Sequence, residues 1–171
     1  AYSLIFFTSL FYVIWKFPLF ILIAKEIPLI GISFTLITLV TGALWGKPTW
    51  GTYWVWDARL TSFLILLFIY MGLIFLEKAF RYTANGDISF SYLAIIGAIN
   101  IPIIKFSVDW WNTLHQPASV LRLDGPTISL EMLTPLLIMF LGSLLLFIYL
   151  MLTNIESAIQ EKKFITQSPR N

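Results

Sequence analysis

Long runs of apolar residues constrain this chain more than any other feature of its sequence. They cover approximately residues 1–15, 19–44, 60–76, 88–104 and 128–152. A helix needs about 20 apolar residues to cross the hydrocarbon core of a bilayer, and a helix satisfies its own backbone polar groups within lipid. We therefore predict an all-α, polytopic helical membrane protein, with about five transmembrane helices in a single membrane domain over residues 1–171.

The composition agrees with this prediction and argues against several other classes of protein. Hydrophobic residues make up 58% of the chain and charged residues only 12%, whereas a soluble domain carries about twice that charge. The net charge is +2, with no basic stripe and no glycine-rich phosphate loop, which argues against nucleic acid as a partner. The absence of cysteine excludes disulfides and thiolate metal sites. No residues form a recognisable catalytic dyad or triad, so we do not expect an enzyme.

The polar segments between the apolar runs indicate a topology. With five spans, a tryptophan-rich segment (45–57) and a long loop (105–127) share one face, and the tail (154–171) lies on the other. The tail's face carries seven basic residues, namely Lys16, Lys25, Lys78, Arg81, Lys162, Lys163 and Arg170. The tryptophan face carries four, namely Lys47, Arg59, Lys105 and Arg122. Because inner loops carry the excess of Lys and Arg, we predict that the tail is inside and the tryptophans face the periplasm or intermembrane space.

The segment WGKPTWGTYWVWD at 45–57 contains four tryptophans. If residues 50–57 were helical, Trp50, Trp54 and Asp57 would lie on one face. Glycine and proline residues interrupt long helices, so we expect a short surface helix or a re-entrant turn here. The residues that carry this expectation are Gly46, Pro48 and Gly51.

Two interpretations of these tryptophans stay open on the residues alone. Trp and Tyr gather at membrane–water interfaces, which favours an aromatic belt. Indole rings also stack in specific geometries, which favours a shelf for a flat apolar ligand.

A second motif, DWWNTLHQP at 109–117, lies on the same predicted face and contains Trp110, Trp111 and the single histidine, His115. Such a histidine is either a solvated loop residue or a metal ligand through its neutral imidazole. A flat apolar ligand whose metal accepts an axial imidazole is haem. On this interpretation a nearby cation would pair with the haem propionates, the candidates being Arg59, Lys47, Lys105 and Arg122.

The stretch WGTYWVWD at 50–57 resembles the WGxxWxWD signature of the haem-handling proteins of cytochrome c maturation, and residues 41–62 and 100–117 look like the CcmC family, haem exporter protein C. The resemblance implies an outer haem platform, with His115 as an axial ligand of the haem iron. The platform residues that it implies are Trp50, Gly51, Trp54, Trp56 and Asp57. Non-covalent haem b is the expected cofactor, and a chain that holds no haem is the alternative.

The chain also departs from the family pattern. The family has six spans and a second axial histidine between the first two, whereas this sequence begins after that point and has one histidine. We therefore expect five-coordinate haem, a second ligand from another chain, or no haem. The resemblance implies as partners a CcmE-like haem chaperone, a CcmD-like small protein and an ABC transporter, and another chain is a candidate source of the missing span.

The function expected from the residues and the resemblance is haem handling and presentation during cytochrome c maturation. The expected location is the mitochondrial inner membrane, with the bacterial plasma membrane as the alternative. A rival interpretation is an accessory subunit of a large respiratory complex that no longer binds haem. A channel or transporter is disfavoured because no span has an obvious ionisable residue near its middle.

Overall fold

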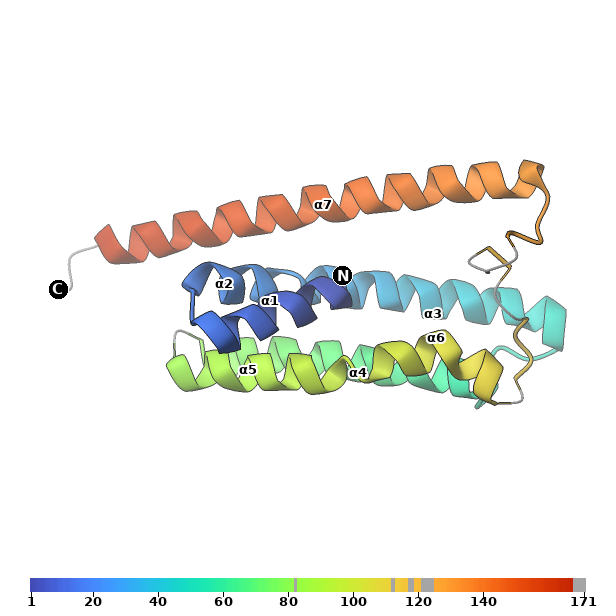
Figure 1. Cartoon of the computed structure of the whole chain (residues 1–171), viewed down its shortest axis with the longest axis horizontal. Coiled ribbons are helices and arrows are strands. Elements are labelled where there is room, and N and C mark those ends of the chain that lie inside the picture. The colour runs from blue at the N-terminus through green and yellow to red at the C-terminus, as the bar shows by residue number, and fades with distance from the viewer. Residues whose placement is uncertain (82, 112, 117–118, 121–124, 168–171) are drawn as a thin grey trace.

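The computed structural model describes residues 1–81, 83–111, 113–116, 119–120 and 125–167, and every regular element among them is an α-helix. The helices are α1 (Tyr2–Trp15), α2 (Pro18–Glu26), α3 (Pro28–Trp50), α4 (Ala58–Ala79), α5 (Ala84–Gly97), α6 (Asn100–Trp110) and α7 (Leu130–Gln167). Figure 1 shows them aligned along one long axis. The predicted all-α fold is confirmed for the described residues.

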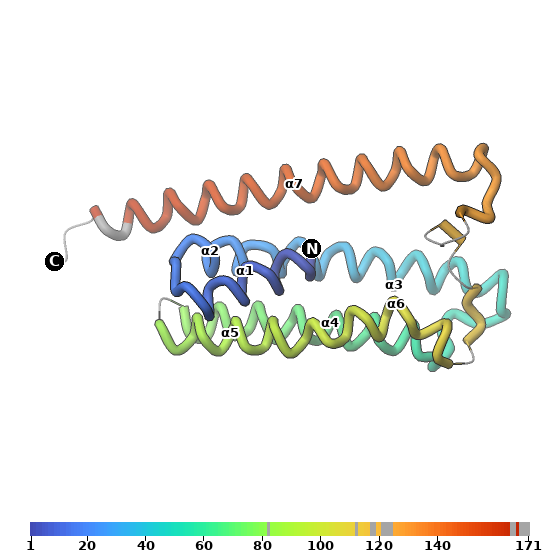
Figure 2. Tube along the Cα trace, viewed as in Figure 1, coloured from blue at the N-terminus to red at the C-terminus, as the bar shows by residue number. Residues whose placement is uncertain are grey.

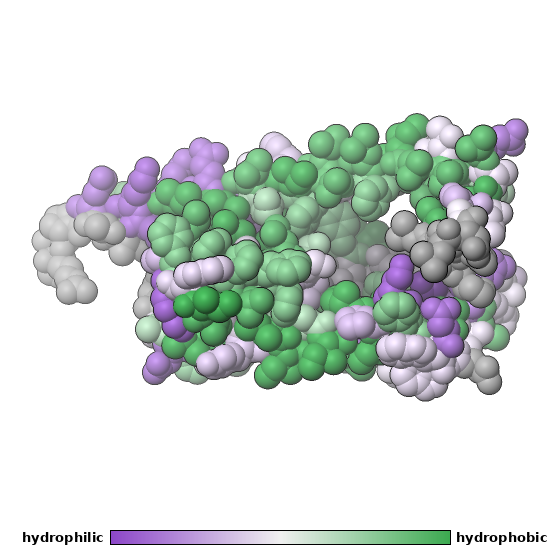
Figure 3. Space-filling view, viewed as in Figure 1, coloured by the Kyte–Doolittle hydropathy of each residue, from purple (hydrophilic) through white to green (hydrophobic). Residues whose placement is uncertain are grey.

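Four helical stretches in the described part are long and apolar enough to cross a membrane. They are 18–50 (α2 with α3), α4, 84–110 (α5 with α6) and 130–164 in α7, and α1 is a shorter apolar helix. Hydrophobic residues cover the middle of the face seen in Figure 3, and hydrophilic ones gather toward its ends. This pattern is that of a polytopic helical membrane protein, as predicted.

The connections between consecutive spans lie at two opposite ends of the bundle (Figure 1). One end, called the tryptophan end below, carries the α3–α4 and α6–α7 connections. The other, called the tail end, carries the α1–α2 and α4–α5 connections and the end of α7. Two of the basic residues counted for topology, Arg122 and Arg170, lie outside the described residues.

The span predicted at 88–104 is two helices that meet at Ala98 and Ile99. Pro102 explains the break, because proline has no N–H and its ring clashes with the carbonyl four residues earlier, at Ala98. The Asn100 side chain is buried at this break and donates a hydrogen bond of 2.9 Å to the Ser62 carbonyl of α4. The interruption therefore places a buried polar contact between α4 and α6.

The core lies toward the tail end, where α1, α2, α4 and α5 pack together (Figure 2). Tyr2 contacts Tyr70 edge to face, with ring centroids 5.4 Å apart, and its hydroxyl donates to the Ala94 carbonyl over 3.1 Å. Gly31 of α3 leaves room for the Tyr70 ring, because a Cβ at this position would lie 2.3 Å from it. One aromatic pair thus joins four helices.

Helix α7 lies apart from the rest of the bundle (Figure 1). Its membrane-length apolar window has no buried residues, and it packs mainly against α2 and α3. It is one continuous helix through Gln167, so residues 154–167 of the predicted tail are helical. Near its C-terminal end, the Asn154 amide donates to the Glu26 carbonyl over 3.3 Å, and Glu161 forms an ion pair with Arg81. Polar contacts thus fasten α7 at the tail end.

Candidate functional site

The tryptophan-rich segment begins as the last turns of α3. The prediction that Gly46 and Pro48 interrupt a long helix here is wrong, because α3 runs through both residues to Trp50. Pro48 has no N–H to donate to the carbonyl four residues earlier, yet the helix continues through it to Trp50. Gly46 is buried under the Trp50 ring, and a Cβ there would lie 3.2 Å from that ring.

Gly51 ends α3 in the left-handed region, with φ of 77°, where glycine has no steric penalty. Its N–H donates to the Lys47 carbonyl over 3.0 Å, and the Lys47 ammonium donates to the Gly51 carbonyl over 3.0 Å. The helix end is therefore closed by both the backbone and a side chain. Lys47 also lies over the Tyr53 ring, 5.2 Å from its centroid.

Residues 51–57 are not helical, so Trp50, Trp54 and Asp57 do not share a helical face. The chain instead reverses direction through this segment, and Asp57 lies at the start of α4. Asp57 is the N-cap of that helix, and its Oδ1 accepts a hydrogen bond of 2.8 Å from the Leu60 N–H. An aspartate in this position satisfies one of the unpaired N–H groups of the first turn.

His115 comes from the α6–α7 connection and contacts the middle and the C-terminal end of the tryptophan-rich segment. Its Nδ1 lies 2.7 Å from Oδ2 of Asp57, and its ring meets the Trp50 ring edge to face at 4.7 Å between centroids. The backbone N–H of His115 donates to the Thr113 hydroxyl over 3.0 Å, and this bond stabilises the local turn. Trp50, Asp57 and His115 therefore form one cluster, which is joined by contacts between separate segments and not by a shared helical face.

An open pocket of about 530 Å³ lies beside this cluster. Pockets that bind small molecules and cofactors span roughly 300–1,000 Å³. Its walls include the rings of Trp45, Trp50 and His115 and the cationic side chains of Arg59 and Lys105. The pocket thus combines aromatic surface, an imidazole and two positive charges, which suits a flat apolar ligand with acidic groups.

Of the four cations predicted to meet propionates, Arg59 and Lys105 line this pocket. Lys47 is instead engaged with Gly51 and Tyr53 at the end of α3. Arg122 lies outside the described residues. The structure therefore separates the candidates that the sequence left equivalent.

The remaining tryptophans do not line the pocket. Trp54 and Trp56 form an edge-to-face pair with centroids 5.5 Å apart, and Trp56 is 75% exposed. Trp110 and Trp111 form a second pair at 6.0 Å, and both are exposed. The buried indole nitrogen of Trp54 has no hydrogen-bond partner in the described part of the chain.

Trp45 is a pocket residue that was not among the predicted site residues. Its ring meets Trp50 edge to face, with centroids 5.3 Å apart. The signal in the sequence is its i, i+4 spacing from Thr49, which places these two residues on one side of a helix. That signal becomes visible only if the helix is known to continue through Pro48.

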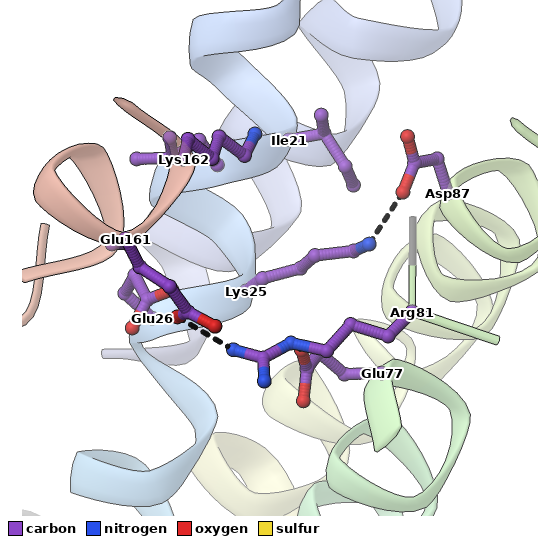
Figure 4. A pocket seen from close by; sticks show the side chains of 10 residues that line it. Ile21, Lys25, Glu26, Glu77, Arg81, Asp87, Glu161 and Lys162 are labelled. Atoms are coloured by element: carbon purple, nitrogen blue, oxygen red, sulfur yellow. Dashed lines mark hydrogen bonds and ion pairs between the residues drawn. The ribbon is translucent and has the colours of Figure 1, made fainter. Parts of the chain in front are cut away.

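A second pocket lies at the tail end and is lined mainly by charged residues (Figure 4). Lys25 forms an ion pair with Asp87, while Arg81 bridges Glu77 and Glu161, each over 3.1 Å. The pocket holds only about 70 Å³, and no group of three or more His, Cys, Asp or Glu residues suited to a metal ion occurs among the described residues. These charges join α2, α4, α5 and α7 and offer no comparable ligand site.

The fold and the pocket together define a polytopic helical membrane protein with an aromatic and histidine-containing pocket at one end. Comparison with known families gives this class a name. The family model "CcmC: Heme exporter protein C" matches residues 1–170. The chain belongs to this family.

Similar proteins agree with this assignment. "Heme exporter protein C" of Bradyrhizobium diazoefficiens is 48% identical over 155 residues, which cover 91% of this chain and 59% of that protein. A "Putative cytochrome c biosynthesis ccmC-like mitochondrial protein" of Marchantia polymorpha is 52% identical over 133 residues, covering 78% of this chain and 55% of that protein. "Heme exporter protein C" of Haemophilus influenzae is 52% identical over 123 residues, with 72% and 50% covered. The chain spans about half the length of these relatives.

Proposed function

We propose that this chain binds haem b without a covalent bond at its tryptophan end and presents it during cytochrome c maturation. The observation that carries this proposal is the convergence of His115, Trp50, Arg59 and Lys105 on one pocket. These residues come from four separate segments, namely the end of α3, helix α4, helix α6 and the α6–α7 connection. The family supports the same role, because similar proteins are named heme exporters.

Each part of the pocket suits one part of a haem molecule. A neutral imidazole is a common axial ligand of haem iron, and His115 supplies one imidazole. The rings of Trp45 and Trp50 offer apolar surface to the macrocycle. Arg59 and Lys105 supply the charge for hydrogen bonds to carboxylates, which are stronger than neutral ones. The residues present therefore fit the cofactor.

The exposed tryptophan pairs have a separate proposed role. Trp54 with Trp56, and Trp110 with Trp111, lie at the same end of the bundle as the pocket. Aromatic side chains of this kind concentrate at membrane–water interfaces and at protein–protein interfaces. We assign them to the rim over which haem passes to a partner, with Gly51 setting the turn between the pocket and this rim.

The chain contains one histidine, so it offers one imidazole to the iron. A second axial ligand would come from outside these residues, or the haem would be five-coordinate. The proposed partners are a CcmE-like haem chaperone, a CcmD-like small protein and an ABC transporter.

The proposed orientation follows the distribution of positive charge. Lys78, Arg81, Lys162 and Lys163 lie near the tail end, and an excess of basic residues favours the inner side of a membrane. The pocket and His115 would then face the intermembrane space or the periplasm. A mitochondrial inner membrane is the proposed location, with a bacterial plasma membrane as the alternative.

An absorbance titration with haem tests this function. The purified protein should bind haem and show the spectrum of an imidazole ligand, and His115→Ala should remove that spectrum while circular dichroism shows unchanged helix content. Helix content is expected to persist because the substitution lies outside the helices and outside the core. A folded protein with no spectral change on addition of haem would overturn the proposal and favour an accessory subunit of a respiratory complex.

A further inference from the structure

We infer that Asp57 is a positioning residue, which holds His115 in one tautomer with Nε2 directed to the pocket. The resemblance to the family implied only that Asp57 belongs to a haem platform. The geometry gives it a different task, because its carboxylate is occupied by two protein donors. The inference rests on the proposed function only for its consequence at the haem iron.

The carboxylate of Asp57 is held by the start of a helix. Its Oδ1 accepts from the Leu60 N–H over 2.8 Å, and its Oδ2 lies 2.7 Å from Nδ1 of His115. The Asp57 side chain is only 5% exposed. Because α4 is one of the membrane-length helices, the position of the acceptor oxygen depends on the scaffold and not on a free loop.

The contact between Asp57 and Nδ1 of His115 determines which nitrogen of the imidazole ring carries the proton. An ionised carboxylate has acceptors only, so the nitrogen that faces it must be the donor. In the neutral imidazole the proton then lies on Nδ1, and Nε2 keeps its lone pair. No group in the described part of the chain forms a hydrogen bond with Nε2.

The ring orientation is limited by a second contact. The edge-to-face arrangement with Trp50, at 4.7 Å and 73°, leaves little room for the ring to rotate. The His115 side chain is 17% exposed and lines the pocket. The contacts with Trp50 and Asp57 therefore direct one nitrogen of the His115 ring to the pocket.

Carboxylate partners of this kind have a known effect on metal ligands. A histidine that binds a metal commonly donates its other N–H to a carboxylate, and mutation of such a partner typically costs 10–100-fold in metal affinity or activity. The same magnitude is expected here for haem affinity. Asp57 would produce this effect on haem affinity through His115, without contacting the haem.

Asp57→Asn separates this role from the capping role. Asparagine is as good an N-cap as aspartate, so its side-chain oxygen can keep the hydrogen bond from Leu60. Its NH₂ group then faces Nδ1 as a donor, which favours the opposite tautomer with the proton on Nε2. An aspartate-to-asparagine change beside a catalytic histidine acts in this way in serine proteases.

The first experiment needs no haem. Because the chain has a single histidine, the imidazole signals belong to His115. Nitrogen NMR of the protein labelled with ¹⁵N-histidine, over a pH series that reaches the neutral ring, should show the proton on Nδ1. Asp57→Asn should move it to Nε2. The matched control is Asp109→Asn, an exposed carboxylate of α6 at the same end of the bundle, which should leave the spectrum unchanged. A native ring protonated on Nε2, or identical spectra for the native and Asp57→Asn proteins, would overturn the inference.

The second experiment measures haem affinity and the midpoint potential of bound haem. Asp57→Asn should lower the affinity about 10–100-fold and shift the potential, with helix content unchanged, whereas Asp109→Asn should do neither. A tautomer change with unchanged haem affinity and potential would overturn the link to the iron. If neither the native protein nor its variants bind haem while the tautomer still changes, the positioning role stands and the proposed function fails.

Discussion

Trp50 and His115 meet edge to face with their ring centroids 4.7 Å apart, although one ends α3 and the other belongs to the α6–α7 connection. This contact forms the aromatic wall of the pocket on which the proposed function depends. Trp56 belongs to the same tryptophan-rich segment but is 75% exposed and lies outside the pocket. Trp50 and Trp56 therefore form a matched pair for substitution.

Trp50→Leu should weaken haem binding by removing the ring that contacts both His115 and Trp45. Trp56→Leu should change haem affinity much less, and its effect on the free energy of unfolding should stay within about 0.5 kcal/mol, as for other exposed residues. Haem titration followed by absorbance, with thermal unfolding of the haem-free proteins, measures both. Equal losses of affinity in the two variants would favour a shared shelf of tryptophans over the pocket.

Two glycines of α3 should respond in opposite directions to alanine. At Gly31 a Cβ would lie 2.3 Å from the Tyr70 ring, so Gly31→Ala should destabilise the bundle by about 1–3 kcal/mol through overpacking. At Gly42 nothing lies within 4 Å, and alanine has the higher helix propensity. Gly42→Ala should therefore be neutral or stabilising. Denaturant titration in detergent, monitored by circular dichroism, compares the two variants, and a stable Gly31→Ala protein would contradict this packing of α3 on α4.

The ion pair between Lys25 and Asp87 should contribute more to stability than the basic residues that surround it. Their side chains are only 14% and 23% exposed, and a hydrogen bond to a charged group contributes about 1.5–3 kcal/mol. We expect Lys25→Met to lower the free energy of unfolding by this amount. Lys78→Met, at an exposed position of α4 near the same end, is the control and should have little effect. Equal stability of the two variants would show that the pair is not a significant contact.

The two ends of the bundle should lie on opposite sides of the membrane. The native chain has no cysteine, so each single-cysteine variant carries one reactive thiol. Ser119→Cys, in the α6–α7 connection, should react with a membrane-impermeant reagent from the outer side. Gln160→Cys, on the exposed surface near the end of α7, should react only from the inner side or after permeabilisation. Labelling of both variants from the same side would exclude this topology.

The apolar runs determined the class of fold, because a segment that cannot expose its backbone to lipid must form a helix whatever its neighbours are. The local signals at helix ends were less reliable. Gly46 and Pro48 were expected to interrupt a helix that continues to Trp50, although Pro48 has no N–H to donate within it. Pro102, by contrast, lies in a region where the chain does break.

The sequence alone also identified the residue types of the site, because a single histidine and a dense group of tryptophans are visible without coordinates. Only the tertiary structure decided which of them meet. Trp50, Asp57 and His115 converge because α3 ends, the chain reverses through residues 51–57, and the α6–α7 connection returns to the same end. Helical periodicity describes neighbours within one helix, whereas this cluster depends on contacts between segments far apart in the chain. For the same reason Arg59 and Lys105 line the pocket together, whereas Lys47 makes a local contact with Gly51 at the end of its own helix.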